Sequence, residues 1–206
     1  MDNPYWELVA PHVAPEQLVW GGKAGPPVIA EPDWGDPNSS YRSLDRAKLV
    51  RTYAWAVPDP ATVEWIAKYA RGRILDPFAG SGYWGWMFVQ AGLDALCFDL
   101  TPPPDHEWYD HQFWPVGRLD AREAARLHSD RTLFVCWPPY ADPIAAETLD
   151  AYTGDRVIYL GESEGGCTGD DQMFKLLQAR WTEVASHVPV RWYGLRDYVT
   201  VFDRKP

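Results

Sequence analysis

Residues 73–82, with the sequence RILDPFAGSG, have the types and spacing that a nucleotide-binding turn needs. A short apolar run ends at the carboxylate of Asp76, and two glycines, Gly80 and Gly82, precede an amphipathic segment. Glycine tolerates positive φ angles and has no side chain to keep a ligand away from the backbone. The helix expected after the turn would offer free N–H groups at its N-terminus. The pattern predicts a strand, a turn and a helix around a nucleotide-like ligand.

A second carboxylate, Asp99, follows the next apolar run, Ala95–Phe98. It lies about 20 residues after Asp76, and a carboxylate at this spacing can accept hydrogen bonds from both hydroxyl groups of a ribose. The alternative is an acidic side chain that lies in solvent at the end of a strand. The glycine turn upstream favours ribose binding.

The turn resembles the Asp-Pro-Phe-x-Gly-Ser-Gly signature of class I S-adenosylmethionine (SAM) methyltransferases, with Asp76, Pro77 and Phe78 followed by Gly80 and Gly82. The resemblance implies that SAM is the cofactor and that Asp76 helps to hold its methionine ammonium group. It also implies that Phe78, Gly80 and Gly82 belong to the cofactor site. Nicotinamide and flavin sites are the competing interpretation, but their turns usually enter through Gly-x-Gly directly from an apolar strand.

The same resemblance implies two further contacts to the cofactor. An acidic residue at the end of the third strand often contacts the adenine amino group in these enzymes, and Asp120 is at that place. An aromatic segment before the turn commonly closes over the methionine end, where cation–π attraction to the sulfonium is worth about 0.5–2 kcal/mol. Tyr53 is the cofactor-binding candidate in that segment and Trp55 the substrate-binding candidate, with core packing as the alternative for both.

Residues 137–140, Trp-Pro-Pro-Tyr, resemble the [Asn/Asp/Ser]-Pro-Pro-aromatic motif of amino-methyltransferases. In that family the polar first residue and a proline carbonyl accept hydrogen bonds from the target amine, and the aromatic residue stacks on the substrate. Trp137 departs from the motif because an indole only donates hydrogen bonds, which argues against a nucleobase amine; we expect it beside the cofactor. Tyr140 keeps the aromatic ring and adds a phenol that can bind substrate or act as a base, with packing under the next helix as the alternative.

Residues 161–171 combine four glycines with four carboxylates. Repulsion between like charges argues against a phosphate cradle and favours a cationic or amine-bearing acceptor. Glu162, the acid nearest the preceding apolar run, is the candidate general base or amine anchor, and Glu164 is a second substrate-binding candidate. The alternative is a surface loop in which Asp170 or Asp171 caps the next helix.

The surrounding pattern predicts the elements that position these residues. Asp59 and Pro60 form a helix N-cap and first position, and apolar residues at helical spacing follow them. Continuous apolar runs typical of buried strands alternate with such helical segments, which predicts a mostly parallel sheet covered on both faces. We expect an α/β, three-layer, Rossmann-like domain with a seven-stranded sheet. Two tail strands, about 182–188 and 198–203, would form the C-terminal antiparallel hairpin that class I methyltransferases have.

Composition sets limits on domains and partners. We expect residues 41–206 to form this domain, and residues 1–40, with many Pro and Gly, to form an irregular N-terminal arm or lid. The net charge of −10 argues against nucleic acid, whose phosphates require Lys and Arg. No signal peptide or apolar stretch near the ~20 residues of a membrane span is present, so we expect a cytoplasmic protein. His106 and His111 lack paired metal-site spacing, and we expect a solvated loop there and no metal.

The sequence therefore predicts a SAM-dependent methyltransferase acting on a small-molecule nucleophile, with an amine favoured. Tyr140 and Glu162 are the catalytic candidates, and Trp55, Tyr140, Glu162 and Glu164 are the substrate-binding candidates. The alternatives are a nucleic-acid or protein amine methyltransferase, a SAM-using aminocarboxypropyl transferase or cyclase, and a non-catalytic Rossmann binding module. A homodimer stays open.

Overall fold

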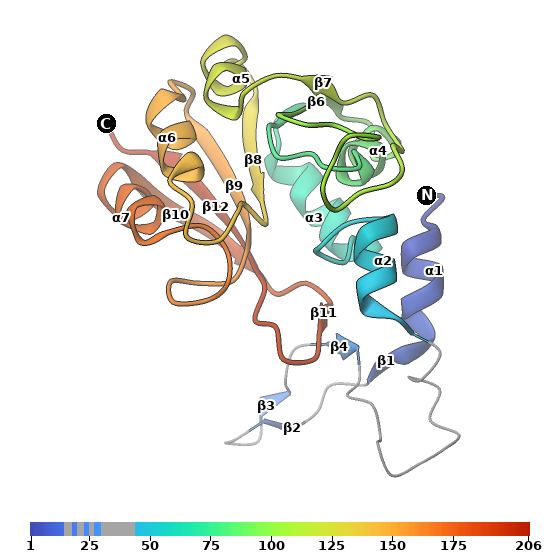
Figure 1. Ribbon diagram of the computed structural model, residues 1–206. Helices are drawn as coiled ribbons and strands as arrows, with labels where there is room; N and C mark the ends of the chain where they lie inside the picture. Colours follow the sequence, from blue (N-terminus) through green and yellow to red (C-terminus); the bar gives the residue numbers. More distant parts are fainter. Residues whose placement is uncertain (15–17, 20–22, 25–26, 30–43) are drawn as a thin grey trace.

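A seven-stranded sheet forms the centre of the computed structural model (Figure 1). The structure describes residues 1–14, 18–19, 23–24, 27–29 and 44–206. The strands of the sheet are β5 (Arg73–Asp76), β6 (Asp94–Asp99), β7 (Gly117–Arg118), β8 (Thr132–Cys136), β9 (Arg156–Gly161), β10 (Trp181–His187) and β12 (Tyr198–Arg204). In space they follow the order β10-β12-β9-β8-β5-β6-β7.

The direction of the strands agrees with the predicted fold class. Strands β5 to β9 pair in parallel, whereas β12 is antiparallel to both of its neighbours, β9 and β10. The chain builds the sheet outward from β5, with β6 and β7 on one side and β8 and β9 on the other. In an open parallel sheet this reversal of order opens a crevice beyond the carboxyl ends of the central strands. The α/β sheet with a C-terminal antiparallel pair is confirmed.

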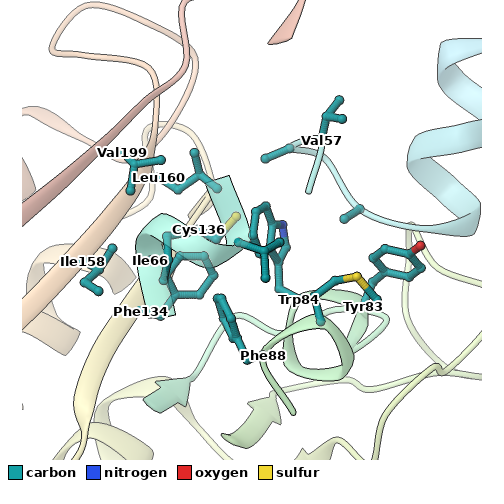
Figure 2. Close-up of a cluster of buried hydrophobic side chains, with 14 of the residues drawn as sticks. Val57, Ile66, Tyr83, Trp84, Phe88, Phe134, Cys136, Ile158, Leu160 and Val199 are labelled. Carbon is teal, nitrogen blue, oxygen red and sulfur yellow. The ribbon is translucent and has the colours of Figure 1, made fainter. Parts of the chain in front are cut away.

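Both faces of the sheet are buried, which gives the molecule three layers. Successive strand residues point to opposite faces, and in β8 Leu133 and Phe134 accordingly belong to two different apolar clusters. Figure 2 shows the cluster that contains Phe134. Its ring packs against Trp84 and Phe88 of helix α4 (Tyr83–Gln90).

The helices divide between these two faces (Figure 1). The first apolar cluster includes residues of α3 and α4 together with residues from the first part of the chain, and the second includes residues of α5, α6 and α7. The bounds are α3 (Pro60–Tyr69), α5 (Ala121–Leu127), α6 (Ile144–Ala151) and α7 (Asp171–Arg180). Asp59, Asp120 and Asp170 each cap one of these helices, because the carboxylate accepts a hydrogen bond from a backbone N–H of the first turn. For Asp170 this capping role is the alternative that the sequence left open.

The first helix, α1 (Pro4–Val9), packs into the same core as α3 and α4. Tyr5 is fully buried, and its hydroxyl accepts a hydrogen bond from the indole N–H of Trp192 at 3.1 Å. Asn3 accepts a hydrogen bond from the hydroxyl of Tyr83 at 2.9 Å. This part of the expected N-terminal arm is therefore tied both to the start of α4 and to the C-terminal region.

A small second sheet, of order β1-β4-β11, joins the two ends of the chain. Strand β4 (Val28–Ile29) lies between β1 (Val13–Ala14) and β11 (Arg191–Trp192). The strands β2 (Leu18–Val19) and β3 (Lys23–Ala24) pair with each other, and helix α2 (Arg46–Thr52) follows. Much of the predicted lid lies outside the described residues, so the lid stays a prediction. Within the described part of the chain, no helix combines the length and apolar character needed to cross a membrane.

Candidate functional site

A cavity of about 940 Å³ opens at the carboxyl ends of β5, β6 and β8. This volume is near the upper end of the range of ligand pockets, about 300–1,000 Å³, so it has room for a cofactor and a small acceptor. The predicted site residues that line it are Trp55, Asp76, Phe78, Gly80, Asp99, Asp120, Trp137 and Tyr140. The predicted residues that do not line it are Tyr53, Gly82, Glu162 and Glu164.

The glycine turn after β5 reaches the cavity wall at Gly80. Gly80 and Gly82 have φ angles of 51° and 74°, in the left-handed region that favours glycine. Hydrogen bonds fix the turn, from Gly82 N to Ala79 O at 2.7 Å and from Ala79 N to Phe98 O at 3.0 Å. A Cβ atom at Gly82 would come within 2.7 Å of the carbonyl oxygen of Trp114. Gly82 therefore allows close packing behind the turn, while Gly80 lines the cavity.

Asp76 ends β5 as a buried carboxyl group, with 2% of its surface exposed. It accepts a hydrogen bond from Phe78 N at 3.2 Å. Burial raises the pKa of Asp76 to about 8, against the smaller opposing effect of this hydrogen bond, and the nearby charge of Asp99 adds to the rise. A cationic group in the cavity would stabilise the ionised form of Asp76.

Asp99, at the end of β6, is held ionised beside the turn. Its carboxylate accepts hydrogen bonds from Gly80 N and Thr101 N, both at 3.0 Å. Burial opposes ionisation, but hydrogen bonding from His106 and from these two N–H groups outweighs it and lowers the pKa of Asp99. His106 Nε2 lies 3.6 Å from Asp99, and His106 Nδ1 accepts a hydrogen bond from Trp108 N at 3.0 Å. The neutral ring therefore carries its proton on Nε2, facing Asp99.

The loop after β6 folds back over the glycine turn, so the expectation of a solvated loop is wrong for His106. Tyr109 is buried, and its ring lies so close to Gly80 that a Cβ atom there would collide with it. His106 and Tyr109 also contact each other edge to face, with ring centroids 4.8 Å apart. Both residues line the cavity. Sequence reasoning missed them because loop composition gives no sign of where a loop without helical or strand periodicity packs.

Asp120 reaches the cavity wall at the start of α5, but an arginine already engages it. Both carboxylate oxygens accept hydrogen bonds from Arg122, whose guanidinium also donates to Glu147 at 2.7 Å. This bonding to Arg122 lowers the pKa of Asp120. Oδ1 of Asp120 already accepts two hydrogen bonds, from the backbone N–H and Nε of Arg122, whereas Oδ2 accepts one and can accept another. The predicted contact to an adenine amino group stays a prediction.

Three tryptophans from distant parts of the sequence form a row along the cavity wall. Trp55 stacks on Trp137, with ring centroids 5.2 Å apart and planes at 11°. Trp108 meets Trp55 at 5.5 Å and 73°. We call Trp108, Trp55 and Trp137 the tryptophan row. Trp55 therefore both packs against protein and faces the cavity, which the two sequence interpretations treated as alternatives.

The segment after β8 has left-handed backbone at both ends. Trp137 and Ala141 have φ angles of 45° and 54°, a conformation that costs non-glycine residues of order 1–3 kcal/mol and gathers at functional sites. The carbonyl of Pro138 accepts a hydrogen bond from Gly169 N at 3.1 Å, and Ala141 N donates to Gly169 O at 2.9 Å. These bonds tie the segment to the loop after β9. Tyr140 projects from it with 68% of its surface exposed and lines the cavity mouth.

Glu162 has both carboxylate oxygens engaged by backbone groups rather than facing the cavity. One oxygen accepts a hydrogen bond from Cys167 N at 2.9 Å and the other from Arg196 N at 2.8 Å. Burial opposes ionisation, but these bonds and bonding to the Cys167 thiol lower the pKa of Glu162. Glu164 is exposed on the same loop. Glu162 therefore links the loop after β9, which contains Cys167, to the loop that contains Arg196.

Tyr53 lies behind the turn, away from the cavity. Its ring stacks on Tyr5 at 5.1 Å and packs against Tyr83 and Phe113. Its backbone carbonyl accepts a hydrogen bond from the hydroxyl of Ser81, in the glycine turn. The structure thus places Tyr53 in an aromatic cluster that supports the turn.

Asp197 is a buried carboxyl group that sequence reasoning missed, with 1% of its surface exposed. Burial raises its pKa to about 7; the Trp137 indole N–H lowers it, and the charge of Glu162 raises it further. In the part of the chain that the structure describes, Asp197 Oδ1 and Trp137 Nε1 are buried and have no hydrogen-bond partner. Nothing in the local sequence distinguishes Asp197 from an ordinary loop acid.

The cavity wall is strongly acidic. Its ionisable residues include the acids Asp76, Asp99, Glu107, Asp120, Asp142 and Glu147. In the described lining, Arg122 is the one arginine or lysine, and it is paired with two of these acids. Cys167 also lines the cavity, and burial together with Glu162 raises the pKa of its thiol to about 11, so it is a poor nucleophile. The described residues hold no group of three or more His, Cys, Asp or Glu arranged for a metal ion.

No protein-family model and no curated protein matches the sequence. Similar folds occur among solved structures. One is 1,6-didemethyltoxoflavin-N1-methyltransferase of Burkholderia thailandensis, with bound 1,6-didemethyltoxoflavin and S-adenosylhomocysteine; identity is 18%, coverage 94% of this chain and 100% of that chain, and the TM-score 0.49. A second is magnesium protoporphyrin IX methyltransferase of Synechocystis PCC 6803 with bound SAM. Its identity is 11%, coverage is 70% of this chain and 79% of that chain, and the TM-score is 0.48. A third is the putative methyltransferase yhhF of Escherichia coli, with 15% identity, coverage of 93% of this chain and 99% of that chain, and a TM-score of 0.46. Identities and scores this low do not transfer an activity from one protein to another.

Proposed function

We propose that this chain is a SAM-dependent methyltransferase whose acceptor is a small-molecule nucleophile, with an amine favoured. One observation carries the proposal, namely the meeting of three different groups in one cavity at the point where the strand order reverses. These are the buried carboxyl group of Asp76, the glycine turn at Gly80 and the ionised carboxylate of Asp99. Asp76 would bind the ammonium group of SAM, the turn at Gly80 would lie against the cofactor, and Asp99 would bind the ribose hydroxyls.

The charges of the cavity support SAM over a dinucleotide. A buried carboxyl group at Asp76 is stabilised in its ionised form by a cation, and SAM carries a sulfonium and an ammonium group. The pyrophosphate of a nicotinamide or flavin cofactor would instead need a compensating positive charge beside the glycine turn. Of the described lining residues, only Arg122 has a permanent positive charge, and Asp120 and Glu147 already neutralise it.

SAM, when bound, supplies an electrophilic methyl group, and the protein has to hold the nucleophile in line with it. Tyr140 is our proposed catalytic residue, because its phenol oxygen stands at the cavity mouth and can accept a hydrogen bond from the acceptor, whose proton then passes to solvent. We assign Glu162 a positioning role, since backbone N–H groups engage both of its oxygens. It holds the loop whose Gly169 fixes the segment that carries Tyr140.

The experiment measures SAM affinity and methyl transfer in matched carboxylate variants. Asp99→Ala removes the proposed ribose contact, and Asp105→Ala removes a carboxylate of the same loop that is exposed and paired with Arg118. Hydrogen bonds to charged groups are worth about 1.5–3 kcal/mol, so Asp99→Ala should weaken SAM binding by roughly 10- to 100-fold. Asp105→Ala should leave it within about twofold.

Transfer is then followed by mass spectrometry with isotope-labelled SAM and a library of small amines. A labelled methyl group on an amine supports the proposal. A labelled aminocarboxypropyl group, or transfer to nucleic acid or protein alone, overturns the acceptor class while leaving the cofactor. Tight SAM binding without turnover on any nucleophile identifies a binding module, and equal SAM binding by the two variants refutes the cofactor site.

A further inference from the structure

The mouth of the cavity is lined by large aromatic side chains, two of which are exposed. Trp108 has 43% of its surface exposed and Tyr140 has 68%. They come from different loops, after β6 and after β8, and both line the cavity. Exposed aromatic residues at a cavity rim are typical of a surface that a ligand covers.

The tryptophan row continues this aromatic surface inward from the mouth. Trp108 meets Trp55, and Trp55 stacks on Trp137, so that the row runs from the loop after β6 to the end of β8. Tyr140 follows Trp137 on the same segment, whose ends are fixed by hydrogen bonds to Gly169. Aromatic rings prefer other rings as neighbours in offset-stacked or edge-to-face geometry. A wall of rigid rings selects ligands by planarity.

The charge of the same wall selects against anions. Glu107 is next to Trp108, and Asp142 follows Tyr140 by two positions; both line the cavity. Among the described lining residues, Arg122 alone could attract an anion, and Asp120 and Glu147 neutralise it at 2.7 Å. Two properties therefore coincide at the mouth, an aromatic surface and a negative potential.

We infer that the acceptor is a flat aromatic ring system, neutral or cationic, that lies against Trp108 and Tyr140 at the mouth of the cavity. This inference rests on the proposed function and narrows its acceptor from small nucleophiles in general to planar, non-anionic heteroaromatic amines. Stacking on the rings gives the acceptor its orientation, and the acidic wall excludes flat molecules that carry carboxylate or phosphate groups.

The experiment uses three probes on the full chain saturated with S-adenosylhomocysteine. 9-Aminoacridine is flat, cationic and fluorescent, and acridine-9-carboxylate has the same ring with a negative charge. 1-Adamantylamine has the positive charge without a flat ring. Fluorescence titration gives the affinity of 9-aminoacridine, and displacement gives the affinities of the other two. We expect 9-aminoacridine to bind at least about threefold more tightly than either competitor, given the usual strength of aromatic pairs.

Variants locate the binding surface. Trp108→Ala and Tyr140→Ala should each weaken 9-aminoacridine binding by about two- to tenfold, whereas Tyr140→Phe, which keeps the ring, should retain it. Tyr193→Ala is the matched control, because Tyr193 is exposed to 54% but does not line the cavity. S-adenosylhomocysteine affinity, measured in every variant, checks that the site is still folded.

Each outcome decides one part of the inference. Equal binding of 1-adamantylamine contradicts selection by planarity, and equal binding of acridine-9-carboxylate contradicts selection by charge. Unchanged affinity in both alanine variants contradicts the site. If S-adenosylhomocysteine itself does not bind, the proposed function fails, and titration of 9-aminoacridine into the unloaded protein still tests the aromatic mouth separately.

Discussion

At the scale of single residues, the cavity is defined by carboxyl groups in unlike surroundings. Asp76 is buried and accepts a hydrogen bond from the backbone N–H of Phe78. Asp99 accepts two backbone hydrogen bonds and faces His106. Burial therefore raises the pKa of Asp76 to about 8, while the pKa of Asp99 is lowered. The two acids respond differently to pH and to a bound cation.

This difference predicts how SAM affinity depends on pH. Below pH 8 Asp76 is mostly protonated in the free protein, and a bound cation favours its ionised form, so binding releases a proton. Affinity should therefore rise between pH 6 and 7.5, with a limit of tenfold per pH unit. Calorimetric titration at several pH values measures this slope. Asp76→Asn should lower the affinity and flatten the slope, and an unchanged slope in that variant would contradict the role of Asp76.

The contact between Gly80 and Tyr109 gives a second prediction at this scale. Gly80→Ala places a methyl group against the ring of Tyr109 and a Cβ on a residue with φ of 51°. We expect a loss of about 1–3 kcal/mol in the free energy of unfolding. In a Tyr109→Ala background the collision is absent and only the backbone cost remains, so the same substitution should cost about 1 kcal/mol. Additive losses in urea unfolding of the double variant would argue against this contact.

The site residues that the sequence predicted are marked by patterns in the adjacent residues, whereas the residues that it missed are not. Asp76, Gly80 and Asp99 are tied to a strand, a turn and a fixed spacing, and all three line the cavity. Tyr109 and Asp197 come from segments without periodicity, and their positions depend on contacts with residues far away in the sequence. For Glu162 the sequence could not reveal that backbone N–H groups engage both oxygens of its carboxylate.

At the scale of elements, the strands and helices with a buried face were predictable, and the short pieces were not. Helix α3, with its Asp59-Pro60 start, and the antiparallel pair of β10 and β12 follow from periodicity and capping residues. The small sheet of β1, β4 and β11 has two-residue strands, which leave no alternation to detect. Its parallel pair joins segments from opposite ends of the chain.

Helix caps give a prediction at this scale. Asp59 is buried; one oxygen caps α3 through Thr62 N at 3.0 Å, and the other accepts a hydrogen bond from Val190 N at 3.1 Å. Asp59→Ala removes the cap and leaves a buried N–H without its partner, so it should cost about 2–4 kcal/mol of unfolding free energy.

Asp45 provides the matched control, because it caps α2 through Lys48 N at 3.1 Å but is exposed. Asp45→Ala should cost only about 0.5–1 kcal/mol in the same chemical denaturation experiment. Equal losses in the two variants would mean that Asp59 does not link α3 to the segment before β11.

At the scale of the whole molecule, the N-terminal helix and the C-terminal region stabilise each other. The hydrogen bond between Tyr5 and Trp192 joins residues 187 positions apart, and the bond between Asn3 and Tyr83 ties the start of the chain to α4. Figure 1 shows α1 beside α2, above the small sheet that contains β11. The composition of residues 1–40 suggested an irregular arm, but α1 contributes fully buried side chains to the core.

Removing residues 1–12 should therefore destabilise the folded domain rather than leave it intact. The deletion exposes the surface covered by Tyr5 and Val9, and we expect a loss of at least about 3–5 kcal/mol, with a clear fall in the melting temperature. Leu8→Ala is the control, because Leu8 lies on the same helix but is exposed; it should change stability by at most about 0.5 kcal/mol. A deletion variant that unfolds like the full chain would show that α1 is not part of the core.

The most direct test of the proposed function is a calorimetric titration of SAM and, separately, of NAD into the full chain at pH 7.5. The arrangement of Asp76, Gly80 and Asp99 around one cavity predicts saturable binding of one SAM per chain and no measurable binding of NAD. Binding of NAD in place of SAM, or no heat from either compound, would contradict the account.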